Sequence, residues 1–160
     1  MRRVVVTGMG LLSPFGVGVS HGWRQVLSGR SAASRIDRFE VDDLPAKIAH
    51  VIPREGEHGF NPEAYLEPKE LRKIGDFILY GIAAADEALR DSGWDPKTAE
   101  ERNATGVMIG SGIGGIDGIA ENALLLKERG PRGISPFFIP GNIINLVSGQ
   151  VSIRQGLKGP

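Results

Sequence analysis

The sequence predicts an α/β fold with a mostly parallel sheet, because short apolar runs alternate along the chain with amphipathic helical patterns. Residues 3–7 and 105–109 have the composition of buried parallel strands, and each run is followed by a glycine. Residues 47–52 are a third strand candidate, closed by Pro53. Right-handed crossovers are expected between parallel strands, and a sheet with so few strands is expected to be incomplete on its C-terminal side.

Helical patterns occupy the intervals between these runs. The helices are expected over residues 21–28, 68–92, 116–129 and 142–155. The first is expected to use Ser20 as its N-cap. The second is the strongest, since apolar residues recur there at three- and four-residue steps and Gly93 supplies its end. An irregular segment at residues 133–141 separates the last two helices.

Composition excludes several classes of protein. The 160 residues suit one domain or one half of a larger two-part domain, and 41% apolar with 24% charged residues excludes a disordered tail. The 19 basic and 19 acidic side chains cancel, so no overall attraction to nucleic acid or membranes is expected. The chain has no cysteine, no leader-like segment and no run long enough to span a membrane, which predicts a soluble cytoplasmic protein.

The glycine-rich turn at residues 110–115 fits the G-x-G-x-x-G pattern and lies between a predicted strand and a predicted helix. A nucleotide-binding α/β domain would also need an acidic residue at a strand end about 20 residues further on. That position falls at residues 128–133, a helix end followed by a Gly-Pro turn. Two interpretations remain: close backbone approach to another element, or nucleotide binding, which predicts saturable binding of NAD(P).

No residue set in the chain supports catalysis or metal binding. The three histidines have no metal-ligand spacing, and no serine stands in a nucleophile elbow. Asp86, Glu87 and Asp91 are explained as a solvated helix face or as cap partners. We therefore predict no catalytic residue, no metal site and no cofactor within the chain.

Several motifs, taken together and in chain order, resemble one family over essentially the whole sequence. They are Arg3-Val4-Val5-Val6-Thr7-Gly8-Met9-Gly10, Ser13-Pro14-Phe15-Gly16, Arg72-Lys73, Asp76-Phe77, Tyr80-Gly81, Gly110-Ser111-Gly112-Ile113-Gly114-Gly115, Ser135-Pro136-Phe137-Phe138-Ile139-Pro140 and Gly156-Leu157-Lys158-Gly159-Pro160. In these motifs the chain resembles the N-terminal part of the β-ketoacyl-[acyl-carrier-protein] synthases, most closely synthase II of bacterial fatty-acid synthesis.

The resemblance implies a thiolase-like fold with five layers, α-β-α-β-α, built from two similar halves and assembled as a homodimer. Residues 1–160 would then form an N-terminal half-domain, truncated before its last strands. Such a cut leaves an unpaired sheet edge, so the isolated piece is expected to aggregate or to persist only with a partner that supplies the missing half.

The resemblance also implies an activity. The intact enzyme would be an acyltransferase that elongates fatty acyl chains by decarboxylative Claisen condensation with malonyl-carrier protein, using a cysteine and two histidines. The family places those residues beyond residue 160, so the chain alone is expected to be inactive. The alternatives are synthase I or a polyketide relative, a catalytically dead homologue that acts as a partner subunit such as a chain-length factor, and the nucleotide-binding domain described above.

Five residues take site roles by resemblance. Ile113 and Phe138 would line the acyl-chain pocket, with Phe138 reaching across the dimer, and an ordinary core role is the alternative for each. Lys69, Arg72 and Lys73 form a basic cluster that would dock the acidic acyl-carrier protein and make docking sensitive to salt. The alternative for this basic cluster is a merely solvated face.

Overall fold

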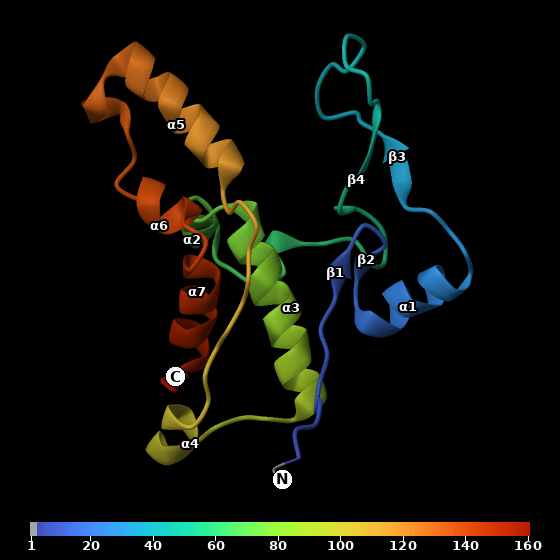
Figure 1. The fold of residues 1–160 in the computed structure, drawn as a ribbon, viewed down its shortest axis with the longest axis vertical. Helices are drawn as coiled ribbons and strands as arrows, with labels where there is room; N and C mark the ends of the chain where they lie inside the picture. The colour runs from blue at the N-terminus through green and yellow to red at the C-terminus, as the bar shows by residue number, and fades with distance from the viewer. Residues whose placement is uncertain (1–2) are drawn as a thin grey trace.

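The computed structural model describes residues 3–160. Its helices are α1 (Val19–Leu27), α2 (Pro68–Leu71), α3 (Asp76–Ser92), α4 (Ala99–Asn103), α5 (Ile116–Arg129), α6 (Phe138–Asn142) and α7 (Leu146–Gln155). Its strands are β1 (Leu12–Ser13), β2 (Gly16–Val17), β3 (Ala33–Arg35) and β4 (Ile48–His50), and short 3₁₀ helices span Pro62–Ala64 and Pro131–Gly133. Helix α3 is central, with α1 and the strands on one side of it and α5, α6 and α7 on the other (Figure 1).

The hydrophobic core forms where α3 packs against α7 (Figure 1). Four large side chains are almost completely buried there: Ile78 and Ile82 of α3, Val147 of α7, and Phe60 from the loop after β4. Gly81 permits the close approach of the two helices, because a Cβ atom at this position would collide with the side chain of Val147. The apolar periodicity of the sequence correctly predicted this face of α3, and Gly93 ends the helix in the left-handed region, at a φ of 65°.

The prediction of one continuous helix over residues 68–92 is wrong, because the chain bends between α2 and α3. The Lys73 amide donates to the Glu70 carbonyl (2.9 Å), which closes the last turn of α2. The Gly75 amide donates instead to the carbonyl of Gly141 at the end of α6 (2.9 Å). A Cβ atom on Gly75 would lie 2.9 Å from that carbonyl oxygen, so this contact favours glycine. We call residues 72–75 the α2–α3 bend. Their backbone is positioned by the hydrogen bond to α6 and is not helical.

The predicted parallel sheet is not found in residues 3–160. The strands form two antiparallel pairs, in which Leu12 faces Val17 and Ala33 faces His50. The strand expected at residues 47–52 is confirmed as β4, although its partner is antiparallel. Residues 3–7 and 105–109 are not strands, since neither segment forms a ladder with another strand in the described part of the chain. The expectation of burial fails for the first run, where Val4 is 95% exposed, and holds on one face of the second, where Val107 and Ile109 pack against the core while Met108 is 98% exposed.

The extended segment after residue 7 runs beside α3 (Figure 1), held by carboxylates of that helix. The Met9 amide donates to Asp91 Oδ2 (2.9 Å), and the Leu11 amide donates to Glu87 Oε2 (2.8 Å). The other oxygen of Glu87 accepts from the amide of Val19, the first residue of α1 (2.8 Å). The prediction of a solvated face or cap partners holds in part: Asp91 is exposed, and Glu87 accepts from the first amide of α1. The prediction did not include the contacts of these two acids with the N-terminal segment, which Glu87 links to α1 and α3.

The remaining helices agree with the sequence pattern except at their ends. Helix α5 covers the predicted residues 116–129. Helix α1 begins at Val19, with Gly18 rather than Ser20 as its N-cap, at a φ of 108° that favours glycine. The last helix begins at Leu146 rather than at residue 142, and residues 138–142 form the separate helix α6, which overlaps the end of the segment predicted to be irregular. No helix within residues 3–160 combines the length and the apolar character needed to cross a membrane.

Candidate functional site

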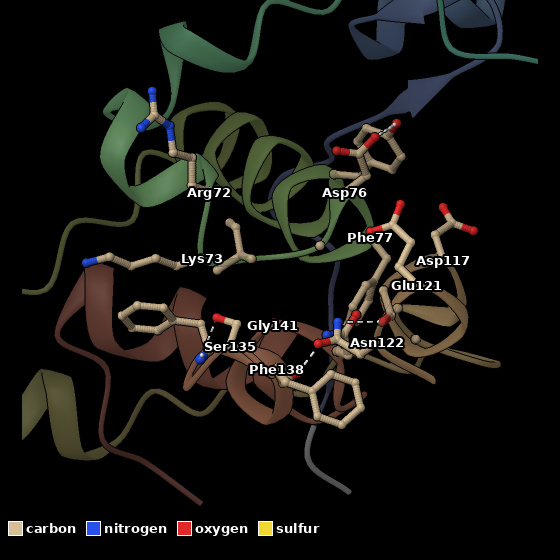
Figure 2. A pocket seen from close by; sticks show the side chains of 18 of the residues that line it. Arg72, Lys73, Asp76, Phe77, Asp117, Glu121, Asn122, Ser135, Phe138 and Gly141 are labelled. Carbon is tan, nitrogen blue, oxygen red and sulfur yellow. Dashed lines mark hydrogen bonds between the residues drawn. The ribbon is translucent and has the colours of Figure 1, made fainter. Parts of the chain in front are cut away.

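A cavity of about 500 Å³ lies where the α2–α3 bend meets α5 and α6 (Figure 2). Phe77 and Phe138 supply apolar surface to its wall. Arg72 and Lys73 lie on one side of the cavity, and Asp76, Asp117 and Glu121 lie on the other (Figure 2). Arg38 also lines the cavity. The cavity is thus basic at the bend and acidic at the first turns of α5.

Close contacts of glycines join the start of α5 to the end of α6 at the wall of this cavity. The Gly115 amide donates to the Asn142 carbonyl (3.0 Å), and Cβ atoms on Gly115 or Gly118 would collide with the Asn142 side chain. Gly114 takes a φ of 77°, which favours glycine at that turn. Of the two interpretations of residues 110–115, these contacts support close backbone approach to another element.

The basic cluster lies at the bend and is exposed. Lys69 belongs to α2, Arg72 caps the end of that helix, and Lys73 follows within the bend. Arg72 and Lys73 line the cavity, whereas Lys69 is not among the described residues that do so. The structure therefore brings two of the three predicted docking residues to one cavity edge, and their role in docking stays a prediction.

The two residues predicted to line an acyl-chain pocket lie in different environments. Phe138, the first residue of α6, is partly buried and lines the cavity. Ile113 lies in the glycine-rich turn before α5 and is 66% exposed; it is not among the lining residues found within 3–160. Neither placement tests the predicted contact with an acyl chain.

Sequence reasoning missed a polar network at the N-terminus of α3. The Arg54 guanidinium pairs with Asp76 (Nη2 to Oδ2, 3.0 Å), and the Tyr80 hydroxyl donates to the same carboxylate oxygen (3.1 Å). The guanidinium carbon of Arg54 also lies 5.1 Å from the centre of the Phe60 ring. The spacing of Asp76 and Tyr80, four residues apart on a helix, could have suggested their contact, but nothing local to Arg54 indicated its partners.

Partial burial, and then the neighbouring Asp76 carboxylate, raise the pKa of Tyr80 above its ordinary value of about 10. A raised folded pKa means that folding favours the neutral phenol, so this contribution to stability is complete below pH 10 and decreases as pH rises further. We expect the unfolding temperature of Tyr80→Phe to fall less steeply than wild type between pH 9 and pH 11, measured by scanning calorimetry. Identical slopes for the two proteins would contradict this.

The described part of the chain contains no cluster of metal-ligating side chains. Among residues 3–160, no group of three or more histidine, cysteine, aspartate or glutamate side chains could hold a metal ion. His21 and His58 stack on each other with ring centres 3.6 Å apart, and His21 Nε2 forms a hydrogen bond with the Phe15 carbonyl (2.9 Å). Neither histidine lines the cavity; together they connect α1 to the loop before Phe60.

Residues 1–160 match the family model for the N-terminal domain of β-ketoacyl synthases. The chain is 55% identical over 162 aligned residues to 3-oxoacyl-[acyl-carrier-protein] synthase 2 of Rhizobium meliloti (strain 1021), covering 100% of the chain and 38% of that relative. It is 45% identical over 161 residues to the enzyme of the same name from Vibrio cholerae, covering 99% of the chain and 37% of the relative. The chain thus spans well under half the length of these relatives.

Solved structures share the overall fold of this chain. A structure described as the ishigamide ketosynthase/chain length factor superposes with a TM-score of 0.79 at 25% identity, over 99% of this chain and 38% of that one. A type II PKS acyl-carrier protein in complex with its ketosynthase bound to the hexaketide gives a TM-score of 0.73 at 26% identity, over 98% of this chain and 40% of that one. The predicted thiolase-like class is supported at this level, whereas the predicted parallel sheet is not.

Proposed function

Because the chain belongs to the β-ketoacyl synthase family, we propose that it forms the N-terminal part of an acyltransferase that elongates acyl chains carried on an acyl-carrier protein. The observation that carries this proposal is the 55% identity to a 3-oxoacyl-[acyl-carrier-protein] synthase 2 along the entire chain. The reaction is a decarboxylative Claisen condensation, in which malonyl-carrier protein supplies two carbons and loses carbon dioxide. This chain contains no cysteine, so its part in the reaction is recognition and positioning rather than thioester chemistry.

Arg72 and Lys73 at the cavity edge, together with the exposed Lys69 of α2, are proposed to dock the carrier. Glu70, a carboxylate beside this basic cluster, is paired with Arg154 (3.2 Å), and Asp76 is paired with Arg54 (3.0 Å). Those two acids are therefore already engaged by other cations, and the exposed charges of Arg72 and Lys73 are directed at solvent and the cavity. An acidic partner would be attracted to this surface, most strongly at low ionic strength.

Phe138 and Ile113 are proposed to line the path of the acyl chain, with Phe138 lying near the second subunit of a homodimer. The support is that Phe138 lines the cavity next to the proposed docking residues. Ile113 lies on the exposed glycine-rich turn before α5, where its side chain is free of close packing on most of its surface.

The proposal is tested by incubating an enzyme that contains this chain with acyl- and malonyl-carrier protein and analysing the carrier by mass spectrometry. The expected product is a 3-oxoacyl group two carbons longer than the starting acyl group. The chain alone serves as the negative control, because it lacks a thiol. Absence of the product from a folded enzyme, with or without added subunits, would reject the proposal.

A second candidate is a non-catalytic subunit that supports a separate condensing enzyme. One structural neighbour is described as a ketosynthase/chain length factor, which makes this assignment worth testing. The same assay separates the two candidates. Product formation without any other condensing subunit favours the acyltransferase, whereas product formation only after addition of a catalytic subunit favours the partner.

A further inference from the structure

The ammonium group of Lys73 lies 5.0 Å from the centre of the Phe137 ring, although the two residues come from segments far apart in the sequence. Both line the basic side of the cavity, and Phe137 is 42% exposed. At this distance a cation is attracted to the face of an aromatic ring. The contact leaves the charge of the lysine unneutralised, unlike an ion pair.

We propose that Phe137 is a positioning residue that holds Lys73 in place for the acidic carrier protein; this inference rests on the docking role proposed above. Lysine has a long, flexible stem, and fixing it during docking costs conformational entropy. A ring that already holds the ammonium lowers this cost in advance. Because the ring occupies one side of the ammonium, its N–H donors on the other side stay available for carboxylates of the partner.

Gly141 sets the geometry of this pair through the backbone. Its amide donates to the Phe137 carbonyl (2.8 Å), and its own carbonyl accepts from the Gly75 amide (2.9 Å). A Cβ atom at Gly141 would lie only 2.8 Å from the Lys73 carbonyl oxygen. One glycine of α6 thus contacts the backbone of both members of the pair, so their relative position does not depend on the side chains alone.

Phe137 directly precedes Phe138, the residue predicted to face the acyl chain. The aromatic ring that contacts the docking lysine and the acyl-pocket candidate are therefore consecutive residues, since Phe137 directly precedes α6 and Phe138 begins it. This arrangement distinguishes Phe137 from an ordinary surface phenylalanine. Its substitution should disturb recognition of carrier-bound substrates while leaving the chemistry of small thioesters unaffected.

The test compares Phe137→Leu, which removes the aromatic face, with Phe137→Tyr, which keeps it, in an enzyme that contains this chain. Carrier affinity is measured by calorimetric titration with purified acyl-carrier protein at low salt. Phe137→Leu should weaken binding about 2- to 5-fold, the range of an exposed cation–π contact, and Phe137→Tyr should match wild type. KM should rise for the carrier-bound substrate with unchanged kcat, while KM for an acyl-pantetheine thioester should not change.

A double-mutant cycle decides whether Phe137 acts through Lys73. In the Lys73→Met background, Phe137→Leu should cause no further loss of carrier affinity. An undiminished loss in that background, or equal losses for leucine and tyrosine, would overturn the proposal and assign Phe137 a packing role. If Arg72→Glu/Lys73→Glu lost carrier binding while Phe137→Leu kept wild-type affinity, the positioning role of Phe137 alone would be rejected. Failure of the wild-type enzyme to bind carrier would instead reject the docking surface itself.

Discussion

Replacing both Arg72 and Lys73 by glutamate is expected to weaken binding of acyl-carrier protein by about tenfold or more at low salt, with little change in unfolding temperature. Both side chains are exposed at the α2–α3 bend, so their exchange leaves the buried core intact. Each reversal turns an attraction to the acidic carrier into a repulsion. The difference between variant and wild type should shrink as salt is raised, since charges about 10 Å apart are largely screened at 0.1 M ionic strength.

The matched control is Arg24→Glu/Arg30→Glu, which changes the net charge by the same amount. Arg24 belongs to α1, which lies on the opposite side of α3 from α5 and α6 (Figure 1), and Arg30 follows that helix; neither arginine lines the cavity. This control variant should bind the carrier nearly as well as wild type. Equal losses in the two double variants would mean that net charge alone governs binding, and no loss in either would remove the α2–α3 bend from the docking surface.

Replacing Glu87 by alanine is expected to lower the free energy of unfolding by about 3 kcal/mol, because charge-assisted hydrogen bonds contribute about 1.5 kcal/mol or more each. The partly buried amides of Leu11 and Val19 would each lose their carboxylate partner. Glu87→Gln should cost about half as much, since an amide side chain has one acceptor oxygen in place of two. Urea unfolding followed by tryptophan fluorescence provides the measurement.

Asp91→Ala is the comparison for Glu87, because Asp91 accepts one exposed hydrogen bond, from the Met9 amide. It should cost less than about 1.5 kcal/mol, the lower end for a charge-assisted hydrogen bond, because water competes for both groups at this exposed position. If Glu87→Ala cost no more than Asp91→Ala, the carboxylate of Glu87 would not hold the N-terminal segment and α1 in place.

Elements determined by local patterns were predictable from the sequence. The residues of α5 and the buried face of α3 follow from apolar periodicity and terminal glycines. The α2–α3 bend was not predictable, because it depends on a hydrogen bond from Gly75 to a carbonyl far along the chain. The prediction of a parallel sheet was wrong for a related reason, because a strand also depends on distant residues. Residues 3–7 have the composition of a strand, but a strand forms only beside a neighbouring strand.

The candidate site divides in the same way. Residue types and motif resemblance pointed to Arg72, Lys73 and Phe138, and the structure places all three around one cavity. The contact of Lys73 with Phe137 and the pairing of Arg54 with Asp76 depend on tertiary structure and leave no local signal in the sequence. Ile113 is exposed on the turn before α5, outside the lining of this cavity, and its role in the acyl path stays a prediction from motif resemblance.

Hydrogen–deuterium exchange of an enzyme that contains this chain, with and without acyl-carrier protein, tests the docking surface most directly. The account predicts that carrier slows exchange in peptides covering residues 67–77 and 135–142, and leaves α1 and β3 unchanged. Slowed exchange confined to α1, β3 or the loop before α4, with residues 67–77 unaffected at saturating carrier, would contradict it.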